Sequence, residues 1–363
     1  MKMTFRWYGP EADPIPLRYI RQIPGMTGLM GLLDKNPGEV WEDGEIAAYM
    51  ETVHESGLAC EVIESVNIHE DIKLGAGARD TYIENYRTTV RNLARHGVKV
   101  IIYNFMPVID WMRTDLSRLI PEDGSYSMYY DERDLEGVEP SEMVRRLTAG
   151  SNGYSLAGYE PERMRILRET MARYEGMTPN RLRENFRYFL DGVIPVCEEV
   201  GVKLACHTDD PAWPLFGLPR IANCFDDLEK LVALHDSPCN TLCVCTGSLG
   251  SNAENDVPAI IRHFGAMNRI GAMHVRNVKR FGPRVFRESS HLSSDGDLDM
   301  LEIMRAIHDT CPDVYVRPDH GRMIWDEQGR PGYGLYDRAL GAAYINGLWE
   351  AVEKLSRSCG AKP

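Results

Sequence analysis

The chain has 363 residues, of which 43% are hydrophobic and 26% charged, which is enough for one large globular domain with a buried core. Its formal net charge of −13 argues against nucleic acid or an anionic membrane as the main partner, because both would repel such a surface. No apolar run approaches the roughly 20 residues that span a bilayer, and the first residues lack the apolar segment of a signal peptide. We therefore expect a cytoplasmic protein, and its nine scattered cysteines are expected to be reduced thiols.

Strand-like and helix-like segments alternate along most of the chain, a pattern typical of a parallel sheet. The predicted strands cover residues 5–7, 28–33, 60–65, 98–104, 202–207, 240–245, 270–278 and 314–317. The predicted helices cover residues 43–56, 80–96, 181–200, 224–235, 257–264, 298–309 and 335–355. Eight such strand and helix units predict an α/β protein of the (β/α)8 barrel type. A doubly wound sheet is the alternative.

One long segment, residues 106–178, interrupts this alternation. It is rich in tyrosine, glycine and charged residues, and it is too long for an ordinary connection between a strand and a helix. We expect an insertion at the barrel mouth or at a subunit contact of a homo-oligomer. The whole chain, residues 1–363, is then a single barrel domain with this insertion.

Polar side chains follow four successive predicted strands in the second half of the chain. They are His207, Cys245, His274 and Asp319. In a (β/α)8 barrel the carboxyl ends of the strands surround the active site, so these four side chains are expected to meet at one rim. A mixed set of nitrogen, sulfur and oxygen ligands suits a first-row transition metal such as Mn, Fe(II), Co or Zn better than Mg or Ca.

Each of these residues has an ordinary structural interpretation when it is taken alone. A histidine at a strand end usually forms a structural hydrogen bond, and a cysteine in a strand is usually a small buried hydrophobe. We prefer His207 to Cys206 because neighbouring strand residues face opposite ways. We prefer Cys245 to Cys243 because it is the last apolar residue before Thr246. Four such residues on four successive strands favour a metal site.

Further basic and polar residues near the predicted strand ends are candidates to bind the carboxylate or hydroxyl groups of a small anionic substrate. They are Arg276, Lys279, Arg317, Arg113 and His69. Considered alone, each of them is equally consistent with a solvent-exposed surface residue that binds no substrate. The chain contains no glycine-rich nucleotide motif and no serine-hydrolase elbow, so ATP use, a dinucleotide cofactor and serine catalysis are unsupported.

Several longer stretches resemble the mannonate dehydratase family. They include Phe5-Arg-Trp-Tyr-Gly9, Val62-Ile-Glu-Ser65, Tyr103-Asn-Phe-Met-Pro107, Cys206-His-Thr-Asp-Asp-Pro211, Cys245-Thr-Gly-Ser248, His274-Val-Arg-Asn277, Arg317-Pro-Asp-His-Gly-Arg322 and Gly332-Tyr-Gly-Leu-Tyr-Asp-Arg-Ala-Leu-Gly341. The resemblance runs from the first predicted strand to the last helix. It implies a xylose-isomerase-like TIM barrel that dehydrates D-mannonate to 2-keto-3-deoxy-D-gluconate in hexuronate (glucuronate) catabolism.

The resemblance also implies a divalent metal, Mn2+ or Fe2+, whose ligands fall on the same four residues, His207, Cys245, His274 and Asp319. It places the acid/base pair on His320 and Tyr333, and we favour His320 as the acid at the leaving hydroxyl. Two alternatives stay open. One is a metal-dependent sugar or sugar-acid isomerase or epimerase on the same barrel, and the other is a non-catalytic metal- or sugar-acid-binding protein.

Overall fold

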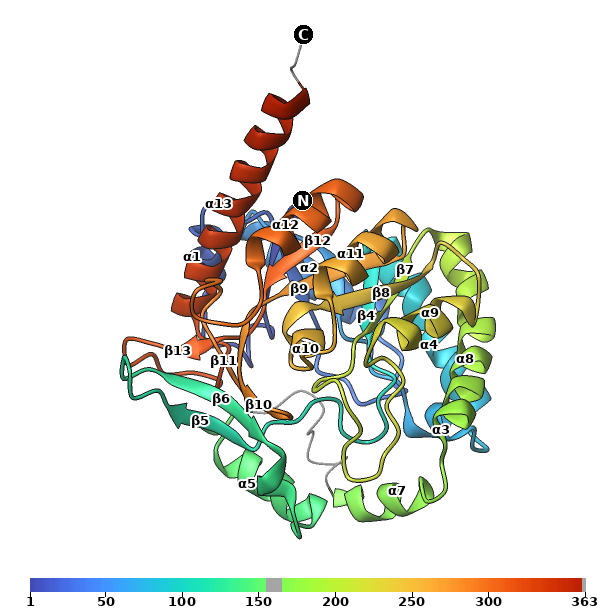
Figure 1. The fold of residues 1–363 in the computed structure, drawn as a ribbon. Helices are drawn as coiled ribbons and strands as arrows, with labels where there is room; N and C mark the ends of the chain where they lie inside the picture. Colours follow the sequence, from blue (N-terminus) through green and yellow to red (C-terminus); the bar gives the residue numbers. More distant parts are fainter. Residues whose placement is uncertain (155–164, 361–363) are drawn as a thin grey trace.

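The computed structural model describes residues 1–154 and 165–360. Within them, eight parallel strands form a closed barrel (Figure 1). They are β1 (Lys2–Arg6), β2 (Gly28–Gly31), β3 (Ala59–Glu64), β4 (Val100–Tyr103), β7 (Lys203–His207), β8 (Asn240–Cys245), β9 (Ile270–Val275) and β12 (Tyr315–Pro318). Because β1 pairs with both β2 and β12, the sheet has no open edge. The predicted (β/α)8 barrel is confirmed, and the doubly wound sheet is excluded.

Helices cover the outside of this barrel, close to the predicted positions. The longer ones are α2 (Asp43–Glu55), α4 (Arg79–Arg95), α8 (Pro179–Val200), α9 (Phe225–Ala233), α11 (Val257–Ala266), α12 (Met300–Thr310) and α13 (Leu335–Gly360), and the short ones are α1 (Leu17–Arg21), α3 (Glu70–Leu74) and α10 (Thr246–Gly250). The start of α8 follows from its sequence. The Thr178 hydroxyl accepts a hydrogen bond from the backbone N–H of Arg181, and Pro179 occupies the first turn, where no N–H is needed.

Side chains alternate along each barrel strand between a helix-facing layer and the barrel interior. On β7, Leu204 and Cys206 belong to the large core between strands and helices, whereas Ala205 belongs to a smaller cluster inside the barrel. His207 therefore faces inward and Cys206 outward, as expected. This alternation turns the last residues of several strands toward one cavity.

The described part of residues 106–178 forms β5 (Asp115–Leu119), β6 (Tyr126–Asp131), the 3-10 helix η1 (Glu132–Leu135), α5 (Pro140–Ala149) and α7 (Leu167–Arg173). β5 and β6 lie at one end of the barrel, beside β10, β11 and β13, whereas α7 lies on the side of α3 and α8 (Figure 1). Residues 155–164 of the predicted insertion lie outside the described residues. A role of this segment as a subunit contact stays a prediction.

A second, antiparallel sheet joins three separate parts of the chain. β6 pairs with β5, with β11 (Val285–Glu288) and with β13 (Arg322–Met323), and β11 pairs with β10 (Val278–Gly282). The sequence did not predict this sheet, and the strand predicted over 270–278 is in fact β9 followed by the start of β10. In the described part of the chain, no helix is both long and apolar enough to cross a membrane.

Candidate active site

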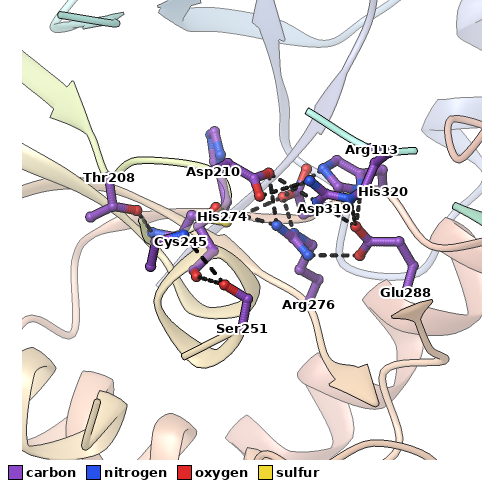
Figure 2. A network of polar contacts seen from close by, with 12 residues as sticks. Arg113, Thr208, Asp210, Cys245, Ser251, His274, Arg276, Glu288, Asp319 and His320 are labelled. Atoms are coloured by element: carbon purple, nitrogen blue, oxygen red, sulfur yellow. Dashed lines mark hydrogen bonds and ion pairs between the residues drawn. The ribbon is translucent and has the colours of Figure 1, made fainter. Parts of the chain in front are cut away.

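The four predicted metal ligands lie at the carboxyl end of the barrel, in two groups that share His274. His207 and Cys245 are the last residues of β7 and β8, His274 is the penultimate residue of β9, and Asp319 directly follows β12. His207 Nε2 lies 2.9 Å from His274 Nδ1, and Cys245 Sγ lies 3.5 Å from Asp319 Oδ2. Candidate ligand atoms of Cys245, His274 and Asp319 all lie within 4.8 Å of one another. Figure 2 shows three of these side chains close together.

Both nitrogens of each imidazole face a polar neighbour. His207 Nδ1 lies 2.6 Å from the carbonyl oxygen of Thr208, which can only accept a hydrogen bond. His274 Nε2 faces Glu64 Oε2 at 3.1 Å, and His274 Nδ1 is the acceptor for Arg317 Nη2 at 3.3 Å. A proton between His207 Nε2 and His274 Nδ1 makes this 2.9 Å contact a hydrogen bond. With the protons on the outer nitrogens instead, both inner nitrogens are available to bind a cation.

Two of the distances between candidate ligand atoms suit a pair of ligands on the same metal ion. Metal–nitrogen and metal–sulfur bonds of about 2.0–2.3 Å place ligand atoms of one ion roughly 3–4 Å apart. The His207–His274 and Cys245–Asp319 distances are close to this range. The donor set also suits a first-row transition metal, because it combines imidazole, thiolate and carboxylate.

Cys243 is a second sulfur near this site. It groups with His207 and His274, because residues two apart on a strand point to the same side. Cys243 belongs to the apolar cluster inside the barrel, together with Ala205 and others, and burial raises the pKa of its thiol well above the usual value. Cys245 lies one layer nearer the barrel mouth and contacts Asp319. This contact favours Cys245 as the ligand.

A cavity opens beside these residues at the barrel mouth. Its lining includes His207, Asp319, His320 and Tyr333 among the predicted site residues, together with Arg317. The remaining lining residues are Arg6, Tyr8, Glu64, Ser65, Ile102, Asn104, Asp110, Trp111 and Asp210. Two of the four candidate metal ligands, His207 and Asp319, therefore face the same cavity as the candidate acid/base pair.

The predicted acid/base residues are adjacent in space. The rings of His320 and Tyr333 have centroids 5.3 Å apart. His320 Nδ1 lies 3.4 Å from Glu288 Oε1, and its Nε2 lies 3.6 Å from Asp319 Oδ2. Burial, followed by the neighbouring Tyr8 and Asp319, raises the pKa of Tyr333 well above the usual value.

Two arginines and two carboxylates form a closed ring of ion pairs beneath the cavity (Figure 2). Arg113 and Arg276 each pair with Asp210 (2.8 Å and 3.0 Å), and Arg276 also pairs with Glu288 at 2.6 Å. Arg113 Nε lies 2.9 Å from Glu288 Oε1, which closes the ring. Arg276 Nε also holds Asp319 Oδ2 at 2.9 Å. Through Arg276, the ring thus holds Asp319, one of the candidate metal ligands, in position.

Burial and ion pairing act in opposite directions on these carboxyl groups. Burial alone would raise their pKa, but Arg276, His320 and Arg113 lower the pKa of Glu288 to about 2. Arg113 and Arg276 likewise lower the pKa of Asp210. The pKa of Asp319 lies well below its usual value because of Arg317 and its neighbours. All three groups are therefore carboxylates near neutral pH.

The five predicted substrate-binding residues fall into two groups. Arg113, Arg276 and Arg317 are buried at the site, but of these three only Arg317 lines the cavity. Arg317 pairs with Glu64 at 3.0 Å and with Asp319 at 2.6 Å. Lys279 pairs with Asp297 at 3.1 Å and is not among the cavity-lining residues. His69 is also absent from that lining. It caps α3 by accepting a hydrogen bond from the N–H of Asp71, and it stacks on Tyr82.

Sequence reasoning missed four residues of this site, namely Arg6, Glu64, Asp210 and Glu288. Arg6, Glu64 and Asp210 lie at or just after strand ends, so the rule that selected the metal ligands also applied to them. Glu288 lies on β11 of the second sheet, and no local signal in the sequence connects it to the barrel.

Comparisons with known proteins agree over nearly the whole chain. A family model described as D-mannonate dehydratase (UxuA) matches residues 1–359. The mannonate dehydratase of Lachnoclostridium phytofermentans is 64% identical over 358 residues, which cover 98% of this chain and 100% of the relative. That of Thermotoga maritima is 55% identical over 358 residues, which cover 98% and 99% of the two chains.

The crystal structure of mannonate dehydratase from Streptococcus suis serotype 2 superposes with a TM-score of 0.88 at 41% identity, covering 98% of this chain and 96% of that one. An L-ribulose 3-epimerase has a TM-score of 0.53 at 14% identity, which shows a shared barrel fold alone. The match of family model, sequence relatives and crystal structure over nearly the full length means that this chain belongs to the D-mannonate dehydratase family.

Proposed function

We propose that the protein is a hydro-lyase that removes water from D-mannonate to give 2-keto-3-deoxy-D-gluconate, a step of hexuronate breakdown. A proton leaves C2, the hydroxyl leaves C3 as water, and the resulting enol rearranges to the 2-keto acid. One observation supports this most directly in a chain of this family. Cys245, His274 and Asp319 form one potential metal-binding group, His207 contacts His274, and His207 and Asp319 line the same cavity as His320 and Tyr333.

Four residues are proposed to hold a divalent metal, Mn2+ or Fe2+. They are His207 through Nε2, His274 through Nδ1, Cys245 through Sγ and Asp319 through a carboxylate oxygen. When bound, the cation supplies a Lewis acid that withdraws charge from the carboxylate end of the substrate and so makes the C2 proton more acidic. Arg276 and Arg317 keep Asp319 ionised and in place for this role.

His320 is proposed to donate the proton that converts the C3 hydroxyl into a leaving water. Both ring nitrogens face carboxylates, Glu288 and Asp319, and carboxylates accept N–H groups only. This arrangement places the ring to present an N–H group to the cavity. His320 can then give one proton to the substrate, and the carboxylates keep the ring oriented.

Tyr333 is proposed to take the proton from C2. Burial raises its pKa, which opposes this role, whereas the positive charge of Arg317 lowers it. A phenol must lose its own proton before it can act as a base, so Tyr333 depends on positive charge near the cavity. The side chain lies beside His320, so the two proton transfers at C2 and C3 are served by neighbouring groups.

The test is a keto-acid assay on D-mannonate combined with metal analysis, with and without chelator. We expect a 2-keto-3-deoxy acid to form, activity to fall on chelation, and Mn2+ or Fe2+ to restore it. An isomeric sugar acid as the product would favour a sugar-acid isomerase or epimerase. Bound metal without any turnover would favour a binding protein. The cytoplasmic location and the homo-oligomeric state stay predictions, and size-exclusion chromatography with light scattering tests the latter.

A further inference from the structure

Arg6 is a buried cation at the cavity that the chemistry described so far does not use. It is the last residue of β1, where Phe5 packs in the core toward the helices and Arg6 faces the barrel interior. Its exposed fraction is 3%, and it lines the same cavity as His320 and Tyr333. Its guanidinium lies 4.7 Å from the centre of the Tyr8 ring, and Tyr8 in turn contacts Tyr333 edge-on.

The other buried arginines of the site are neutralised by short ion pairs. Arg113 and Arg276 belong to the closed ring with Asp210 and Glu288, and Arg317 has carboxylate oxygens at 2.6 Å and 3.0 Å. Their positive charges are therefore already matched by protein carboxylates. Their positive charge is therefore less available to attract a substrate anion.

Arg6 differs from them. The nearest carboxylate oxygen paired with it is Glu64 Oε2, 3.9 Å from Nη1, which is too far for a hydrogen bond. Among the described residues, Nη1 of Arg6 has no hydrogen-bond partner although it is buried. Nε and Nη1 of Arg317 also lack a hydrogen bond, but they lie 3.0 Å and 2.6 Å from carboxylate oxygens, so the charge of Arg317 is matched at a shorter distance than that of Arg6. A buried guanidinium with unsatisfied N–H groups is unfavourable unless a ligand supplies an acceptor.

A substrate carboxylate is an acceptor of the required kind. The planar guanidinium can donate two parallel hydrogen bonds to the two oxygens of a carboxylate. The cavity lining contains four acidic residues, Glu64, Asp110, Asp210 and Asp319, which would repel an anion. A sugar acid therefore needs a cation in this lining whose charge is not already matched at short range, and Arg6 meets this condition better than Arg317.

We propose that Arg6 binds the C1 carboxylate of the sugar acid and so distinguishes aldonates from neutral sugars. This assignment rests on the proposed function, because it takes D-mannonate as the substrate. Held by Arg6 next to Tyr8, the carboxylate end lies on the same side of the cavity as Tyr333, which is the group proposed to act at the adjacent C2.

The test compares Arg6→Met and Arg6→Lys with wild type in the keto-acid assay. Arg6→Met is expected to raise the KM for D-mannonate on the order of 10- to 100-fold, the loss expected for a hydrogen-bonded ion pair, with a smaller change in kcat. Arg6→Lys keeps the charge, and its KM for D-mannonate is expected to lie between those of wild type and Arg6→Met. Circular dichroism and metal affinity by chelator competition are expected to match wild type, because Arg6 is not a proposed ligand.

Competitive inhibition provides a readout that a purely structural role would not change. Wild type is expected to bind D-gluconate more tightly than the uncharged D-mannitol, and Arg6→Met is expected to lose this preference. Arg330→Met is the matched control, since Arg330 also stacks on Tyr8, at 3.4 Å, but is absent from the cavity lining. Its KM and its preference for the anion are expected to stay near those of wild type.

Three outcomes would contradict the assignment. Turnover by Arg6→Met with an unchanged KM and an unchanged preference for D-gluconate would overturn the role of Arg6 and leave the proposed function intact. The same KM increase in Arg330→Met without one in Arg6→Met would move the carboxylate site to Arg330. Wild-type protein that forms no keto acid would overturn the proposed function, and this assignment with it.

Discussion

Glu64 Oε2 lies 3.1 Å from His274 Nε2, on the side of the imidazole that faces away from His207. The carboxylate stays charged, because Arg317 and His274 hold the pKa of Glu64 well below its usual range although burial opposes this. Carboxylates behind a metal-binding histidine commonly fix its tautomer and increase its basicity. Glu64 is therefore suited to keep Nδ1 of His274 free for a metal.

The first prediction concerns this contact. Glu64→Gln is expected to weaken metal binding about 10- to 100-fold, the usual cost of losing such a partner, as measured by competition with a chelator. Glu61→Gln is the matched control, since Glu61 lies on the same strand but pairs with Lys2 at 3.2 Å, away from the candidate ligands. An equal loss of affinity in both variants would contradict a specific role for Glu64.

The second prediction separates the two sulfurs of β8. Protein loaded with Co2+ is expected to show a thiolate-to-metal absorption band, because a cysteine sulfur is among the proposed ligands. Cys245→Ser is expected to abolish this band and to lower the metal content after gel filtration. Cys243→Ser is expected to keep both the absorption band and the metal content of wild type. Loss of the band in Cys243→Ser and its retention in Cys245→Ser would reverse the assignment.

The third prediction assigns the two proton transfers. His320→Asn and Tyr333→Phe are each expected to lower kcat about 10²- to 10⁴-fold, the usual effect of removing an acid or base, with metal content unchanged. In D2O, His320→Asn is expected to exchange the C2 hydrogen of D-mannonate without eliminating water. Tyr333→Phe is expected neither to exchange the C2 hydrogen nor to eliminate water. Exchange in Tyr333→Phe but not in His320→Asn would interchange the two roles.

The fourth prediction concerns stability in acid. The pKa of Glu288 is about 2 in the folded protein and near its ordinary value of 4.5 in the unfolded chain. As the pH falls, Glu288 is therefore protonated at a higher pH in the unfolded chain than in the folded protein. The stabilisation by Glu288 is complete above pH 4.5 and is lost between pH 4.5 and 2. That shift corresponds to about 3 kcal/mol in the free energy of unfolding.

Urea unfolding at several pH values across this range measures the effect. Wild type is expected to lose more stability on acidification than Glu288→Gln, which has no carboxyl group to protonate at this position. Glu254→Gln, at an exposed position, is expected to follow the wild-type pH dependence. Parallel pH curves for wild type and Glu288→Gln would show that Glu288 does not contribute.

Local sequence patterns were sufficient to predict the barrel and the position of the candidate ligands at its carboxyl end. Alternation of strands and helices identified the barrel strands, and period-two alternation selected His207 over Cys206. The four ligand candidates lie at or next to the ends of four strands, so the geometry of a closed barrel places them at the same rim. The family resemblance added His320 and Tyr333, which no periodicity would have selected.

Contacts between distant segments could not be predicted in the same way. The second sheet joins β6, β11 and β13, and its strands are short enough to look like loop residues. Glu288 and Arg113 meet only because this sheet forms. The sequence also gives no indication of which cations are already paired, so Lys279 was ranked with Arg317 although it contacts Asp297 away from the cavity.

The ring of Arg113, Asp210, Arg276 and Glu288 also has a consequence for how the family can vary. Its two positive and two negative charges cancel inside a buried space, so one replacement leaves an excess charge that solvent cannot reach. A second replacement elsewhere in the quartet can restore the balance. Substitutions at these four positions are therefore expected to arise in compensating pairs during evolution, while the loops around them diverge freely.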